Sequence, residues 1–188
     1  MILFNSISNF MKDINNISNY ILKNNIKVNN KKIIFSVLLV EDRTFFHHKG
    51  VCFRSLLRAF IKSYGGASTI NMQLVRTITG RRELTIRRKI RECILSLIID
   101  RKFEKKEIIN AYLACAYFGV DIYGVNKLSL EFFNGVDINN ISLNDAFFMA
   151  SLLKRPYPGI ISLDWAYKVN IRMNYIRKLY IAHVNRNE

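Results

Sequence analysis

Residues 85–102 read TIRRKIRECILSLIIDRK, with apolar residues at helical spacing throughout. Ile86, Ile90 and Ile94 fall on one stripe of a helix, and charged residues gather on the opposite side. Residues 93–99 are apolar almost all round, which is typical of a helix inside a domain. We therefore predict a helix here whose second half runs through the middle of the domain.

Similar patterns occur along most of the chain, whereas the alternation typical of strands is lacking. Ser68 and the pair Ser142 and Asp145 are suitable helix start signals. The fold class predicted from these patterns is mainly α, with residues 1–31 as a helical and polar N-terminal extension and residues 32–188 as the main domain. Besides a weak helix in the extension and the one over 85–102, the expected helices cover residues 51–64, 69–77, 105–117, 142–154 and 164–184.

The chain is strongly basic, with 29 Lys and Arg against 14 Asp and Glu and a formal net charge of +15. Such a surplus favours partners that carry phosphate, but charge alone does not separate nucleic acid, anionic lipid and a phosphorylated substrate. No signal peptide is visible, and the longest apolar run, residues 33–40, is far shorter than the ~20 residues of a spanning helix. We therefore expect any membrane contact to be peripheral. No Cys or His spacing suits a zinc site.

Two acids and two histidines follow this apolar run directly, in the segment VEDRTFFHHKG at residues 40–50. A carboxylate beside an apolar wall has its pKa raised by desolvation, which suits a general base near neutral pH. Glu41 is therefore a candidate base. The structural alternative is that Glu41 or Asp42 caps a helix and that His48 bonds to the backbone.

A second acid, Glu92, lies among Arg88, Lys89 and Arg91. These cations would keep Glu92 ionised and still leave positive charge for an anionic substrate. Between the two acids, the small residues at 65–69 run into a predicted helix start, a geometry that binds phosphate through free backbone N–H groups. Two acids in different surroundings can thus divide two catalytic roles.

Together these pieces resemble, over residues 37–178, the peptidoglycan glycosyltransferases, known as glycosyltransferase family 51. The first family motif, E-D-x-x-F-x-x-H-x-G, is matched by Glu41, Asp42, Phe45, His48 and Gly50. The second, G-(G/A)-S-T-I-x-Q-Q-x-x-K-N, is matched by Gly66, Ala67, Ser68, Thr69, Ile70 and Gln73. The third, R-K-x-x-E, is matched by Arg88, Lys89 and Glu92. The fourth, K-x-E-I-(L)-x-x-Y-L-N, is matched by Lys105, Glu107, Ile108, Tyr112 and Leu113.

Four positions depart from these motifs. Met72 stands where the family has the first of two glutamines, Arg76 replaces a Lys, Thr77 replaces an Asn, and Ala114 replaces the final Asn. Arg76 keeps the charge, but Met72 and Ala114 lack polar groups that could orient a sugar. These two positions motivate an alternative hypothesis, a degenerate module that binds a lipid-linked cell-wall precursor without polymerising it.

The resemblance implies a lysozyme-like fold with a small membrane-facing jaw lobe, in which residues 32–188 polymerise lipid II into glycan strands. Glu41 would be the general base, the donor anomeric carbon would invert, and Glu92 would organise cations or assist the leaving group, with Mg²⁺ or Mn²⁺ as an optional cofactor. Besides these two catalytic residues, the implied substrate-binding residues are Asp42, Phe45, His48, Gly66, Ser68, Thr69, Gln73, Arg76, Arg81, Arg82, Arg88, Lys89 and Tyr112.

The resemblance also bears on the expected partners and location. Arg54, Arg58 and Lys62 lie on one face of the predicted helix over 51–64, where the jaw would contact the membrane. The expected partners are lipid II, the growing glycan strand, the membrane surface and other cell-wall synthesis proteins. The expected location is the extracytoplasmic face of the bacterial inner membrane, bound peripherally.

Two competing functions come from the same features. Paired carboxylates on a lysozyme-like fold also hydrolyse glycans, so a muramidase-like glycosidase is one alternative, although the cationic cluster favours a phosphorylated substrate. A nucleic-acid-binding protein is the other, but no reader motif accompanies the charge, and nucleic acid is not an expected partner.

Overall fold

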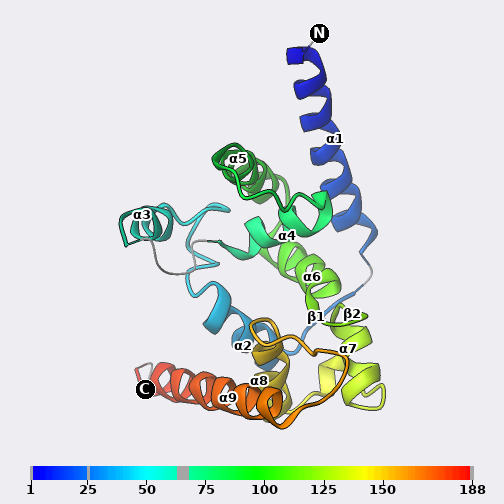
Figure 1. The fold of residues 1–188 in the computed structure, drawn as a ribbon, viewed down its shortest axis with the longest axis vertical. Coiled ribbons are helices and arrows are strands. Elements are labelled where there is room, and N and C mark those ends of the chain that lie inside the picture. Colours follow the sequence, from blue (N-terminus) through cyan, green and yellow to red (C-terminus); the bar gives the residue numbers. More distant parts are fainter. Residues whose placement is uncertain (1, 25, 63–67, 187–188) are drawn as a thin grey trace. The chain divides into compact units, whose positions relative to one another are not determined.

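The computed structural model describes residues 2–24, 26–62 and 68–186, which are mainly helical and form two compact units (Figure 1). Unit 1 comprises Met1–Ile26 and Thr44–Tyr112, and unit 2 comprises Lys27–Arg43 and Leu113–Glu188. The predicted mainly α class is confirmed, and each predicted helix is present with ends within a few residues of those expected.

The described residues of unit 1 form four helices and most of a fifth. These are α1 (Ile2–Lys23), α3 (Phe53–Lys62), α4 (Ile70–Thr79), α5 (Ile86–Lys102) and α6 (Lys105–Cys115), whose last residues belong to unit 2. α4 packs against α5, and α1 packs against both of them. Thr69 and Thr85 cap α4 and α5, each accepting a hydrogen bond from a backbone N–H of the first turn. The N-cap of α4 is therefore Thr69 and not the predicted Ser68.

The orientation of α5 corrects the prediction that it runs through the middle of the domain. Ile86 and Ile94 are 79% and 44% exposed, whereas Glu92 and Ser96 are buried beside Leu95. The buried face of α5 thus combines Glu92 and Ser96 with Leu95 and Ile99, and the isoleucine stripe faces outward. Helical spacing shows that a helix has two faces, but the ion pairs of Glu92, described below, decide which face lies inside.

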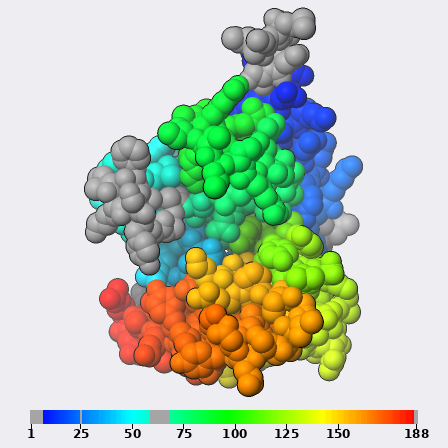
Figure 2. Space-filling model, in the orientation of Figure 1, coloured from blue at the N-terminus to red at the C-terminus, as the bar shows by residue number. Residues whose placement is uncertain are grey.

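Unit 2 is centred on α2 (Lys31–Glu41) and α8 (Leu143–Leu152), which pack against each other and against α9 (Leu163–Val184). The apolar run of α2 shows no clear polar face because most of its middle is buried, and this helix is absent from the predicted set. α9 lies at the surface of unit 2, where its orange and red atoms are visible along its length (Figure 2). The remaining elements are the strands β1 (Tyr117–Gly119) and β2 (Ile122–Tyr123), α7 (Val125–Phe132) and the 3-10 helix η1 (Ile138–Asn140).

Local polar contacts fix the ends of helices in unit 2. The Asn30 side chain caps α2, and its amide donates to the carbonyls of Ile138 and Ile141 at 3.1 and 3.0 Å. Ser142 accepts from the backbone N–H of Asp145, which confirms the predicted start of α8. Throughout the described part of the chain, no helix combines the length and the apolar character needed to cross a membrane.

Candidate active site

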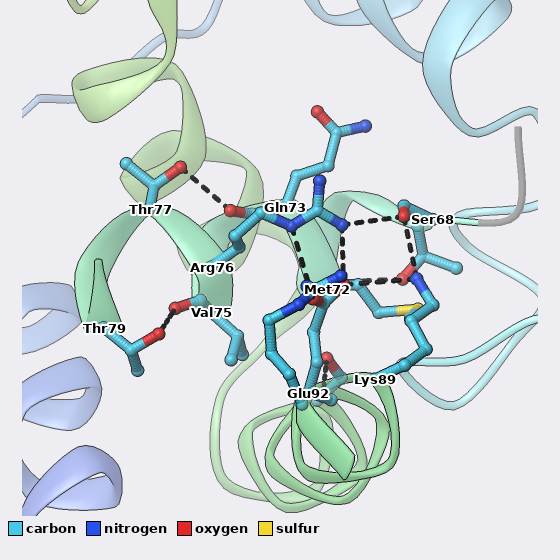
Figure 3. Close-up of polar contacts among 12 residues, drawn as sticks. Ser68, Met72, Gln73, Val75, Arg76, Thr77, Thr79, Lys89 and Glu92 are labelled. Carbon is cyan, nitrogen blue, oxygen red and sulfur yellow. Dashed lines mark hydrogen bonds and ion pairs between the residues drawn. The ribbon is translucent and has the colours of Figure 1, made fainter. Parts of the chain in front are cut away.

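Glu92 is the centre of a cluster of charged side chains in unit 1 (Figure 3). Its side chain is only 3% exposed, and α5 brings it against α4. Arg76 donates to both carboxylate oxygens, from Nη2 at 2.8 Å and from Nε at 3.3 Å. Arg88 Nη1 pairs with Oε2, and Lys89 Nζ lies 3.3 Å from Oε1. One buried carboxylate is therefore held by three cations.

Ser68 joins two of these cations from the other side (Figure 3). Its Oγ accepts hydrogen bonds from Arg76 Nη2 at 2.9 Å and from Lys89 Nζ at 3.0 Å. Three positive charges against one carboxylate leave an excess of two in the cluster. Pre-oriented cations with such an excess suit a ligand that carries or develops negative charge, because little reorganisation is then needed when it binds.

The Lys89 ammonium is partly withdrawn from water. Burial lowers the pKa of Lys89, and the attraction of Glu92 opposes this shift without cancelling it. Because the folded chain then releases this proton at a lower pH than the unfolded chain, Lys89 makes the folded state gain stability as the pH rises between the two pKa values. Over the same window, the cluster loses one of its charges.

This shift predicts the pH dependence of activity. If the charge of Lys89 supports turnover, Lys89→Arg is expected to move the alkaline side of the pH–rate profile to higher pH, because a guanidinium stays protonated there. Initial rates of the glycan polymerisation that the family resemblance implies, measured from neutral to strongly alkaline pH, would test this. Lys106→Arg, on the exposed side of α6, is the control, and identical alkaline midpoints for all three proteins would contradict the prediction.

A small hollow that is partly open to solvent adjoins the cluster within unit 1. Arg81 and Arg91 lie in its wall, and both pair with the Asp13 carboxylate of α1. Arg82 is exposed and is not among the lining residues. The full lining consists of Val75, Arg76, Thr79, Arg81, Arg88, Arg91, Glu92 and Leu95.

Asp13 is a residue that sequence reasoning missed. It lies in the segment treated as an extension, and its partners are 68 and 78 residues away along the chain. An acid on a helix rich in Asn and Ser carries no local signal of such a role. Only the packing of α1 on α4 and α5 brings it to the arginines.

The first-motif residues of unit 1 form a braced loop. Phe45 is fully buried, and Lys105 Nζ lies 4.7 Å from its ring centre while donating to the His48 carbonyl at 2.7 Å. Thr69 Oγ1 donates to the Gly50 carbonyl at 2.7 Å. Gly50 has φ +85°, and a Cβ there would lie 2.3 Å from the Ser96 carbonyl oxygen, so no larger residue fits. The contacts of Phe45 and Thr69 described here are thus with other parts of the protein, namely Lys105 and the Gly50 carbonyl.

The second and fourth motifs meet in a hydrogen bond between Tyr112 and Gln73. The buried Tyr112 hydroxyl donates to Gln73 Oε1 at 3.0 Å. Met72, next to Gln73, is fully buried and packs inside unit 1, and the exposed Thr77 donates its hydroxyl to the Gln73 carbonyl. Ala114, in unit 2, presents its carbonyl to Gly124 in close contact.

Glu41 and Asp42 belong to unit 2, where they end the buried helix α2. Glu41 is half-buried, and Asp42 is the C-cap residue, buried, with its backbone N–H bonded to the Leu38 carbonyl. Arg43 Nε donates to the Leu39 carbonyl at 2.9 Å and closes the helix end. The two acids therefore directly follow a helix whose middle is buried.

Two predicted site groups lie outside the described residues, Gly66 and the side chain of Lys62. Within the described part of the chain, no three His, Cys, Asp or Glu side chains come together as metal ligands. Both oxygens of Glu92 contact cations, which does not suit a divalent ion bound to that carboxylate.

Comparisons with known proteins agree with the motifs. The family model described as transglycosylase matches residues 11–178. Penicillin-binding protein 1A of Aquifex aeolicus is 37% identical over 130 residues, which cover 66% of this chain and 18% of that protein. Penicillin-binding protein 1A of Rickettsia felis is 35% identical over 153 residues, 77% of this chain and 19% of that protein.

Penicillin-binding protein 1B of Haemophilus influenzae is similar as well, at 31% identity over 163 residues, which cover 80% of this chain and 20% of that protein. The chain spans about a fifth of the length of these curated relatives. The match to the family model extends from α1 into α9 and includes both Glu41 and the Glu92 cluster. The chain therefore belongs to the transglycosylase family.

Proposed function

We propose that this chain is a peptidoglycan glycosyltransferase that polymerises lipid II into glycan strands. The observation that carries the proposal is the Glu92 cluster, in which three cations surround one buried carboxylate. A donor that leaves as a pyrophosphate develops negative charge, and pre-oriented cations stabilise that charge. Membership of the transglycosylase family supports the same reaction.

In the proposed reaction, Glu41 takes the proton from the 4-hydroxyl of the acceptor sugar. The oxygen of this hydroxyl forms a bond to the donor anomeric carbon, the bond from that carbon to the phosphate oxygen breaks, and undecaprenyl pyrophosphate leaves. Attack from the face opposite the leaving group inverts the anomeric configuration. Arg76, Arg88 and Lys89 would stabilise the pyrophosphate, and Glu92 would hold these cations in place.

Two competing readings are less well supported. A glycosidase has no need of a cationic cluster, because its leaving group is a sugar hydroxyl. The non-catalytic module was motivated by Met72 and Ala114, but Met72 is fully buried in unit 1, and the Ala114 carbonyl is in close contact with Gly124 in unit 2. Neither the cationic cluster nor the position of Met72 favours the glycosidase or the non-catalytic module over polymerisation.

The test is to incubate the purified chain with lipid II in detergent and to separate the products by size. The expected result is glycan polymer that muramidase degrades. Soluble fragments released from finished cell wall, without polymer, would favour the glycosidase, and binding of lipid II without any product would favour the non-catalytic module. The divalent ion remains a prediction, which the same assay checks with and without a chelator.

Peripheral membrane association through α3 is the further part of the proposal. Phe53 and Leu57 are 67% and 61% exposed on the helix that also carries the exposed Arg54 and Arg58. A helix with exposed apolar side chains and neighbouring bases suits the interface of an anionic membrane.

Replacing Arg54 and Arg58 by Ser is expected to weaken binding to anionic lipid vesicles roughly tenfold or more, at about 1 kcal/mol per base. Vesicle co-sedimentation measures this. Turnover of lipid II in detergent is expected to change little, because these bases would act on the membrane. Lys168→Ser on α9 is the control, and unchanged vesicle binding of the double variant would contradict the prediction.

A further inference from the structure

Asp13 of α1 is a buried acid that lies outside every family motif matched above. Its residue is 7% exposed, and one carboxylate oxygen, Oδ2, meets two arginines. The distances are 2.7 Å to Arg91 Nη2, 2.9 Å to Arg91 Nε and 3.2 Å to Arg81 Nε. The ring of Phe10, one turn earlier on α1, lies 5.0 Å from Arg91 Cζ. α1 therefore contacts Arg91 through the Asp13 carboxylate and through the Phe10 ring.

Both arginines line the hollow beside the Glu92 cluster. The lining of the hollow contains four arginines but only one acid, Glu92. The arginines are Arg76, Arg81, Arg88 and Arg91. Like charges that line one hollow repel one another, more so where water is partly excluded. Asp13 supplies a second carboxylate from behind the wall, which offsets the repulsion between Arg81, Arg91 and their neighbours.

The geometry leaves these arginines able to bind. A guanidinium carries five N–H donors in a fixed plane. Asp13 meets Nε of Arg81, whose Nη1 lies 4.0 Å from Glu83, and it meets Nε and Nη2 of Arg91. Asp13 therefore engages only part of each guanidinium, and both arginines line the hollow.

We propose that Asp13 is a positioning residue, which holds Arg81 and Arg91 as donors in the wall of the anion site and makes α1 a part of that site. The inference rests on the proposed function, since the anion it concerns is the pyrophosphate of the donor. Asp13 acts through the arginines and touches no reacting atom.

The experiment is a calorimetric titration of the full chain with inorganic pyrophosphate, which needs no turnover. For Asp13→Asn, the dissociation constant is expected to rise about tenfold, within the range of coupling between contacting charged residues. Asp13→Glu is expected to restore most of the affinity. Asp164→Asn, which removes an exposed acid paired with Lys168 on α9, is the matched control and is expected to change nothing.

A double-mutant cycle separates positioning from a general loss of structure. In an Arg81→Gln, Arg91→Gln background, Asp13→Asn is expected to cause no further loss of pyrophosphate affinity. A loss that persists in this background, or an affinity of Asp13→Asn that equals or exceeds that of the wild type, would overturn the proposal. Should Asp13→Asn not fold, the pyrophosphate affinity of Asp13→Glu is compared with and without the two Arg→Gln replacements. A near wild-type affinity of Asp13→Glu that requires both arginines supports positioning.

Kinetics with lipid II add a second readout. The KM for the donor is expected to rise for Asp13→Asn with kcat changed less, because binding donors are lost and the base is untouched. If the wild type makes no polymer, the proposed function fails, while the pyrophosphate titration still reports on Asp13. The two failures are therefore distinguishable.

Discussion

Glu41→Gln is expected to lower the rate of glycan polymerisation by at least about a hundredfold, the lower range for loss of a general base. The amide has nearly the shape of the carboxylate but cannot take the proton of the attacking hydroxyl at neutral pH. Because Glu41 is half-buried at the end of α2, the change is expected to leave the fold intact. Initial rates from lipid II, with the thermal transition measured on the same samples, test this.

Glu131→Gln is the control for Glu41, since Glu131 is an exposed acid on α7 of the same unit. Its rate is expected to equal that of the wild type. Equal amounts of polymer from Glu41→Gln and wild type would remove Glu41 from the chemistry. In that case the family match would still hold, but the base would have to be another group.

Glu92→Gln is expected to lower both stability and activity. The change leaves Arg76, Arg88 and Lys89 facing a neutral amide in a place where Glu92 is only 3% exposed. Removing one partner of a buried ion pair costs about 3 kcal/mol or more, since the remaining charges stay without compensation. Because the cations also lose their common anchor, polymerisation is expected to fall as well. Urea unfolding and initial rates measure the two effects.

Glu83→Gln serves as the matched control for Glu92. Glu83 is 55% exposed and lies 4.0 Å from Arg81, so its surface ion pair is expected to contribute less than about 1 kcal/mol. If Glu92→Gln unfolds at the same urea concentration as Glu83→Gln, the Glu92 cluster does not stabilise unit 1 as described. If stability falls but the rate does not, Glu92 has a structural role alone.

Helix positions were predictable because the signals are local. Ser142 and Asp145 lie within one turn of the helix that they start, and the apolar spacing of α4 to α6 spans a few residues. α2 was missed because burial over most of its length removes the polar face on which a periodic pattern depends. The strands β1 and β2 are too short to show any alternation.

The part of the candidate site that was predictable from sequence consists of residues close together along the chain. Arg88, Lys89 and Glu92 stand within one helical turn, so their grouping follows from helix geometry. Arg76 comes from another helix, and its bidentate contact with Glu92 depends on the packing of α4 against α5. The family motifs placed Arg76 in the site, whereas no pattern along the chain did so for Asp13.

The amino-acid sequence by itself determined the helical class, most helix positions and the family, because caps, spacing and motifs are properties of neighbouring residues. Only the tertiary structure decided that α5 turns Glu92 inward and Ile86 outward, and that α1 brings Asp13 to Arg81 and Arg91. The physical reason is that a charge is buried where partners from distant segments surround it, and such partners are assembled by packing.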